Sequence, residues 1–174
     1  WLALTAMLSL LALGSACSKG PTDGGPEKPD NAKVFKPKGN EGIIPGKIAY
    51  NGTAPAANKT DTPADAACAS KNPNLETEEN LVKDGKLANV FVYIKDGTLA
   101  DGTKISDLSW ETPTSEVSLD QSGCHYIPHV MGAQVKQKLK ITNSDPTQHN
   151  IHFTPKVNVE WNQSQANGAP PMTH

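Results

Sequence analysis

Short segments in which apolar and polar residues alternate recur along this chain from about residue 42 onward, with turn-forming residues between them. The clearest is AQVKQKLKITN, residues 133–143, which sets Val135, Leu139 and Ile141 against a row of lysines. A period of two places successive side chains on opposite faces of a β-strand. Many short strands, together with 14 Gly and 14 Pro, predict an all-β fold built as an antiparallel sandwich.

Four other segments have the composition of strands. They are residues 46–52 (GKIAYNG), 87–97 (LANVFVYIKDG), 116–120 (EVSLD) and 149–153 (HNIHF). Segment 87–97 is apolar on both faces, so we expect it to be a central strand that is covered on both sides. Residues 62–73, TPADAACASKNP, are the one stretch that favours a helix, and they favour it weakly.

The first sixteen residues, WLALTAMLSLLALGSA, form an uncharged apolar run that is shorter than the roughly 20 residues of a membrane span. The run ends in small residues before Cys17, which is the layout of a secretory signal peptide. It also resembles the lipobox of bacterial lipoproteins, although Gly14 stands where Leu is usual, and this resemblance implies that Cys17 is lipidated. The alternative is a plain cleaved signal. Because the run starts at Trp1 without a basic flank, we expect the natural chain to begin earlier.

Residues 17–41 are rich in Gly, Pro, Lys and Asp, which predicts a flexible tether before a folded domain at 42–174. Hydrophobic residues make up 36% of the chain and aromatic residues 5%, so we expect part of it to be unpacked. The net charge is −2 and no basic block occurs, which argues against a nucleic-acid partner. The apolar run, Cys17 and the tether together predict an exported protein of the periplasm or cell envelope, lipid-anchored to a bacterial membrane.

Three cysteines occur in the chain. A lipidated Cys17 leaves Cys68 and Cys124, an even pair in an oxidising compartment, and we expect them to form a disulfide. Closing a loop of about 57 residues would stabilise the fold by about 4 kcal/mol on the chain-entropy model. The competing hypothesis makes one of these cysteines a copper thiolate.

His149 is the histidine that most affects a functional interpretation. Strand alternation places it with Ile151 and Phe153 on the core-facing side, and places Asn150 and His152 on the other side. A buried imidazole needs a partner, either a backbone carbonyl or a metal. The spacing does not decide between them, and His149 and His152 cannot bind one ion from a regular strand.

The segment LKITNSDPTQHNIHF, residues 139–153, resembles the strand, turn and His-Asn step of the cupredoxins, the blue-copper family of plastocyanins and azurins. Together with residues 87–97 and 120–135 it is also similar to the plastocyanin-like bacterial proteins often labelled methylamine-utilisation or cupredoxin-domain lipoproteins. The resemblance implies a Greek-key sandwich and a type 1 copper with His149 as its first ligand. It also implies that Asn150 braces the ligand loops and that the protein transfers electrons to a redox partner protein.

A blue-copper site uses two His, one Cys and a distant Met, yet no cysteine follows His149 in this sequence. The last residues, NGAPPMTH, end without the final strand that a sandwich needs. We therefore expect the Cys-His-Met loop to follow His174 in the natural chain, which leaves Met172 and His174 as loop residues. The alternative makes Met172 and His174 ligands of an unusual His/Met copper site.

Two other histidines and three lysines support weaker hypotheses about metal binding and partner docking. His125 and His129 have a metal-binding spacing, but Pro128 between them argues against the helix that this spacing requires. Lysines 136, 138 and 140 form a solvated strand face or, alternatively, a docking patch for an acidic redox partner. No nucleophile–base pair or paired carboxylates stand out, so we expect no enzyme. Two functions remain: a copper electron carrier, and a metal-free β-sandwich binding or structural module of a cell-envelope lipoprotein.

Overall fold

The computed structural model describes residues 32–174, so the predicted signal peptide, Cys17 and most of the predicted tether lie outside the described residues. The elements are β1 Lys33–Phe35, η1 Thr62–Ala64, α1 Ala66–Lys71, β2 Val82–Lys83, β3 Lys86–Leu87, η2 Ile105–Asp107, β4 Leu108–Trp110, β5 Val117–Ser122, β6 His125–Ile127, β7 Leu139–Asn143, β8 His149–Phe153, β9 Trp161–Gln165 and β10 Met172–Thr173. Strands outnumber helices, in agreement with an all-β class. None of the helices formed by these residues is long and apolar enough to span a bilayer.

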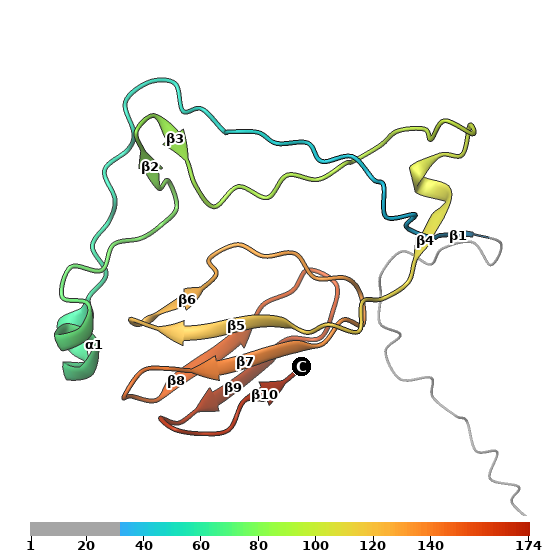
Figure 1. Ribbon diagram of the computed structural model, residues 1–174. Coiled ribbons are helices and arrows are strands. Elements are labelled where there is room, and N and C mark those ends of the chain that lie inside the picture. The colour runs from blue at the N-terminus through green and yellow to red at the C-terminus, as the bar shows by residue number, and fades with distance from the viewer. Residues whose placement is uncertain (1–31) are drawn as a thin grey trace, which may run out of the picture.

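The largest sheet has four strands in the order β10-β7-β5-β6 (Figure 1). β5 and β6 form an antiparallel hairpin in which Ser122 faces His125, whereas β5 and β7 run parallel and align Leu119 with Ile141. β10 pairs with the other edge of β7. The parallel β1–β4 pair lies apart from this sheet and brings a strand into the range predicted as a tether. The expected antiparallel pairing is wrong for these strands, because β5–β7 and β1–β4 are parallel pairs. The sheets are small and mixed.

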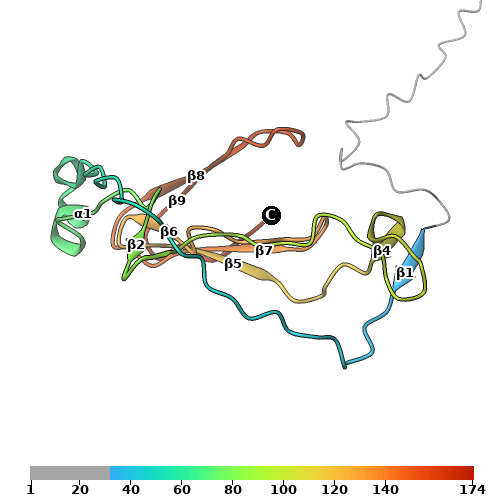
Figure 2. The same cartoon turned by 90° about the horizontal axis from the view of Figure 1, so that it is seen from above.

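The core lies between the four-stranded sheet and the β8–β9 hairpin. Figure 2 shows this hairpin as a separate layer over the sheet. Leu119 and Ile141 from the sheet meet Ile151 from β8, and these three side chains form the buried cluster. The alternation at 116–120, 139–143 and 149–153 arises from this packing, since one face of each strand is covered. The predicted strand 133–143 forms only from Leu139 onward, and Val135, expected to face inward, is 62% exposed.

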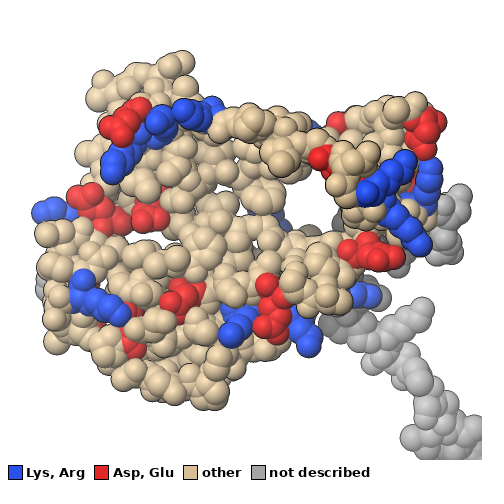
Figure 3. Space-filling model, viewed as in Figure 1, with Lys and Arg blue, Asp and Glu red and all other residues tan. Residues whose placement is uncertain are grey.

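The segment 87–97 does not form the central strand that its composition predicts. Residues 88–96 have no strand assignment, and the side chains from Val90 to Ile94 are exposed, with Val92 at 73%. A strand that is apolar on both faces needs a cover on each side, and residues 32–174 supply neither. Segment 46–52 likewise contributes only a single bridge, between Ala49 and Lys86. Figure 3 shows an open gap between these extended segments and the sheet, and charges of both signs on the visible face.

Candidate functional site

His149 begins β8 at the end of the core, and its side chain is 18% exposed. Ile151 is buried, Phe153 is half-buried, and Asn150 and His152 are exposed. The predicted division of faces is therefore confirmed. The strand thus carries an imidazole on its inner side, close to the turn that joins β7 to β8.

The hairpin turn between β5 and β6 consists of two residues, and both have positive φ: 66° for Gly123 and 62° for Cys124. Positive φ at both central positions is typical of the tight turns that match the twist of a hairpin. In a turn of this kind, two successive amide N–H groups can form a concave site for an anion. Here the anion is a side chain of the protein, because Gly123 N–H and Cys124 N–H donate to the two oxygens of Asp145, at 2.8 and 2.7 Å.

Asp145 is the centre of this cluster. Its side chain is fully buried, and besides the two amides its carboxylate meets the Lys71 ammonium at 2.9 Å and His149 Nε2 at 2.8 Å. Burial alone would raise the pKa of this carboxyl. The Cys124 amide and the Lys71 ammonium outweigh burial and hold the pKa of Asp145 well below its ordinary value, so the group is an ionised acceptor.

Both ends of helix α1 contact the turn that joins β7 to β8. At its start, Asp65 accepts hydrogen bonds from the Ala67 and Cys68 amides and from the hydroxyl of Thr147. At its end, Lys71 also donates to the carbonyl of Ser144. The helix therefore holds the stretch of chain that precedes His149.

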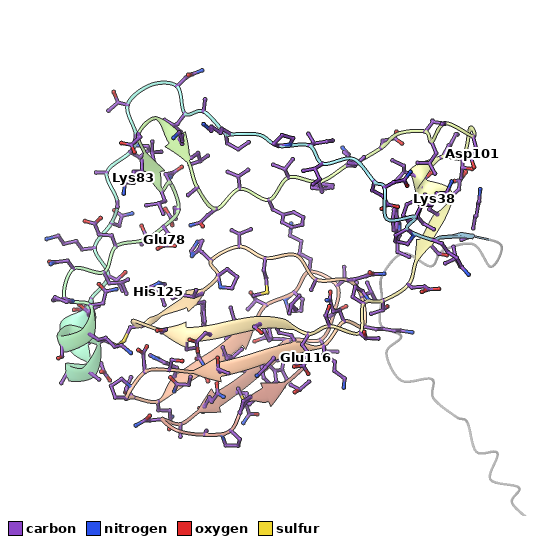
Figure 4. All side chains as sticks on the ribbon, viewed as in Figure 1. Lys38, Glu78, Lys83, Asp101, Glu116 and His125 are labelled. Carbon is purple, nitrogen blue, oxygen red and sulfur yellow. A yellow bond between two sulfur atoms is a disulfide. The ribbon has the colours of Figure 1, made fainter. Side chains whose placement is uncertain are left out.

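A disulfide joins Cys68 of α1 to Cys124 of the turn, with the Cα atoms 5.6 Å apart. Figure 4 draws it as a yellow bond between α1 and the tip of the β5–β6 hairpin, and labels His125 on β6. The pair is the one that the cysteine count predicts. Since Cys124 is oxidised, it offers no thiolate, and the competing hypothesis of a copper thiolate at Cys68 or Cys124 does not fit this structure.

Cys124, Asp145 and His149 place potential ligand atoms within 4.8 Å of one another. Two of the three are already engaged, because the sulfur is in a disulfide and the carboxylate accepts four hydrogen bonds. The cluster itself is therefore a set of contacts that orients His149. Of the three groups, the His149 imidazole has a free nitrogen, because its Nε2 contacts Asp145 and its Nδ1 makes no hydrogen bond among residues 32–174.

A polar cavity of about 150 Å³ adjoins the cluster. Its lining residues are Gln121, Cys124, His125, Tyr126, His149 and Asn150. Gln121 is buried and donates to Gln165, while its Oε1 has no hydrogen-bond partner among the described residues. The cavity thus borders His149, and one of its lining residues carries a buried acceptor without a partner.

Asn150 lies on the exposed face of β8. Its side chain donates to Asn162 on β9, and its carbonyl accepts from the Tyr126 hydroxyl. These bonds connect β8 to β9 and β6.

Met172 and His174 lie away from His149. His174 stacks on Trp161 and Phe153, with ring centroids 4.7 and 5.5 Å apart. This stack is at the far end of β8, about 13 Å along the strand from His149 at roughly 3.3 Å per residue. The structure therefore contradicts the alternative of a copper site made by His149 with His174. Met172 belongs to β10, which pairs with β7, and it packs against the core cluster, so the expectation that it is a loop residue is wrong.

The other histidines have protein partners. His125 Nδ1 is 3.2 Å from the carbonyl of Gly123, His129 lies 3.7 Å from Glu78, and His152 contacts Glu160. These contacts leave His125 and His129 in separate surroundings. Of the lysine row, Lys136 has a positive φ of 67° and precedes β7, so these lysines do not form one regular strand face.

Sequence reasoning missed Asp145 and Lys71. The signal for Asp145 is an Asp-Pro step four residues before His149, but that step also suits an ordinary turn. Nothing local in the sequence connects Lys71 to this turn. Comparison with protein-family models, with curated proteins and with solved structures finds no match for this chain.

Proposed function

We propose that this protein is an exported copper-binding electron-transfer protein of the cupredoxin type. The observation that carries the proposal is the orientation of His149: Nε2 is held by the Asp145 carboxylate at 2.8 Å. Histidines that bind metals commonly donate their other ring N–H to a carboxylate or carbonyl, which fixes the ring and leaves the remaining nitrogen to the metal. Here that nitrogen is Nδ1.

Copper would supply a one-electron couple at this site, and an imidazole nitrogen is a ligand that it accepts readily. His149 would hold the ion, Asp145 would hold His149, and Asn150 would join the strands beside it. A redox partner protein would dock at the surface near this end of the fold. Such a protein carries electrons and is not an enzyme.

The finer fold proposed with this function is a cupredoxin-like Greek-key sandwich, with the four-stranded sheet as one layer and the β8–β9 hairpin as part of the other. The buried contact of Leu119 and Ile141 with Ile151 supports two facing layers. Side chains that interdigitate between two sheets are what makes the core of a sandwich.

Copper titration of the natural full-length protein tests the function. We expect one copper per chain, and we expect His149→Ala to weaken binding more than tenfold because it removes a direct ligand. His152→Ala is the matched control, since His152 lies three residues away on the exposed face and contacts Glu160. Equal losses from the two variants, or no uptake of copper by the wild-type protein, would refute the proposal.

A metal-free binding or structural module is the second candidate. It is favoured by the disulfide, which removes the Cys124 sulfur from metal chemistry. On this hypothesis neither histidine variant changes any metal affinity, and the copper titration distinguishes the two candidates.

We also propose that the protein is tethered to a bacterial membrane through a lipidated Cys17. The support is the sequence of residues 1–17, which lie outside the described part of the chain. Fractionation is expected to place the wild-type protein with membranes, and Cys17→Ala is expected to release it or to block its processing. Wild-type protein found wholly in the soluble periplasm would overturn the anchor.

A further inference from the structure

We propose that Asp145 is a positioning residue that selects the tautomer of His149, keeping the proton on Nε2 and the lone pair on Nδ1. The use of that lone pair for a metal rests on the proposed function. The selection of the tautomer does not, because it follows from the hydrogen bonds of the carboxylate alone.

The Asp145 carboxylate is held in one orientation. Its four partners come from three separate parts of the chain: Lys71 in α1, the Gly123–Cys124 turn, and His149 in β8. The disulfide fastens α1 to the turn, and the Asp145 amide is itself bound by the side chain of Asn143, at 3.0 Å. Rotating the carboxylate would break several charge-assisted hydrogen bonds in a fully buried position.

The two oxygens of the Asp145 carboxylate have different neighbours. Oδ1 receives the Gly123 amide and the Lys71 ammonium, whereas Oδ2 receives the Cys124 amide and faces His149. An ionised carboxylate is an acceptor only, and an amide or an ammonium is a donor only. His149 must therefore donate, which it does with a proton on Nε2.

A neutral imidazole carries one ring proton. With that proton on Nε2, the lone pair is on Nδ1. A metal can bind the Nδ1 lone pair without first displacing a proton from it. Asp145 thus prepares the ligand atom before any metal arrives, in the way that outer partners of metal-binding histidines generally act.

Asp145→Asn tests the selection, because the amide group must turn in a known direction. In the place of Oδ1 its NH₂ would oppose two donors, the Gly123 amide and the Lys71 ammonium. In the place of Oδ2 it opposes one donor, the Cys124 amide, and lies beside His149. The NH₂ is therefore expected at the Oδ2 position. There it donates to Nε2, and the ring proton moves to Nδ1. The variant is therefore expected to hold the opposite tautomer, with the hydrogen bond from the Cys124 amide lost.

The matched control is Asp120→Asn. Asp120 accepts hydrogen bonds from the hydroxyls of Thr142 and Ser144, which can also act as acceptors. It lies near the same end of the sheet but does not contact His149, so its replacement is expected to leave the tautomer unchanged.

The readout is the pair of imidazole ¹⁵N chemical shifts of His149 in metal-free protein, measured at alkaline pH where imidazole is neutral. We expect the proton on Nε2 in the wild-type protein and in Asp120→Asn, and on Nδ1 in Asp145→Asn. A wild-type spectrum with the proton on Nδ1 overturns the proposal, whether or not the variant folds. So does a folded Asp145→Asn protein that keeps the proton on Nε2.

Copper binding separates this proposal from the function on which it partly rests. Asp145→Asn is expected to weaken Cu(II) binding by about 10- to 100-fold, with Asp120→Asn unchanged. If the wild-type protein shows the expected tautomer but takes up no Cu(II), the proposed function fails and the positioning role of Asp145 stands. If the wild-type protein binds Cu(II) with the proton of the metal-free imidazole on Nδ1, the positioning role fails and the function stands.

Discussion

Replacing both bridging cysteines, as Cys68→Ser/Cys124→Ser, tests whether the disulfide acts mainly on the unfolded chain. The two residues are 56 positions apart, and in the chain-entropy model a loop of this length contributes about 4 kcal/mol to the free energy of unfolding. In the folded protein the contacts around the bridge remain, because Asp145 still accepts the two amides of the turn and Asp65 still caps α1. The loss should therefore be close to the full loop term.

The assay is equilibrium unfolding in urea, followed by tryptophan fluorescence and circular dichroism on the same samples. With a slope of about 2 kcal/mol/M, a loss of about 4 kcal/mol lowers the urea midpoint by about 2 M. Both residues are replaced together because a single variant leaves a free thiol that can form mixed disulfides. Ser70→Ala, at an exposed position of the same helix, is the matched control and should leave the midpoint nearly unchanged.

Reduced wild-type protein supplies the second comparison. If loop entropy is the main term, the double variant and the reduced wild-type protein should unfold at nearly the same urea concentration. A loss below about 1 kcal/mol, well short of the chain-entropy value, would refute the reasoning. So would a double variant that is much less stable than the reduced wild-type protein, since the cost would then lie in the folded state.

Two further predictions concern the core and the buried carboxylate. Ile141→Ala should lower the free energy of unfolding by about 2–5 kcal/mol because Ile141 is fully buried, whereas Val135→Ala, at a position 62% exposed, should cost less than about 0.5 kcal/mol in the same urea assay. The pKa of Asp145 is lowered by folding, so its stabilising contribution is present at neutral pH and is lost as pH falls below the ordinary range of an aspartate carboxyl. Urea midpoints at stepped pH should fall less steeply for Asp145→Asn than for the wild-type protein, and an identical acid slope would contradict this assignment.

The sequence predicted those features that depend on neighbouring residues. Alternation located β5, β7 and β8, because each has one covered face, and it placed His149 on the inner side of β8. It could not show that β5 and β7 pair in parallel, since alternation is the same in either direction. It also mistook apolar composition at 87–97 for a covered strand, because composition does not show whether a covering layer is present.

Local sequence patterns could not predict the cluster around Asp145, for a different reason. Its supporting contacts join parts of the chain that are far apart, as in the hydrogen bond from Thr147 to Asp65 across 82 positions. A turn residue such as Asp145 becomes a buried acceptor only when α1 and the β5–β6 hairpin close over it. The histidine could therefore be predicted from its strand, but the residue that orients it could not.

The left-handed backbone of Cys124 determines which residues are favourable at position 124 once the disulfide is lost. A residue other than Gly, Asn or Asp in this conformation costs about 1 kcal/mol, so a lineage that lost Cys68 would gain by drifting to Gly or Asn at position 124. The two amides would still point at Asp145 after such a change, because they belong to the backbone. A descendant protein could thus discard the disulfide and inherit the arrangement around His149 through the shape of the turn alone.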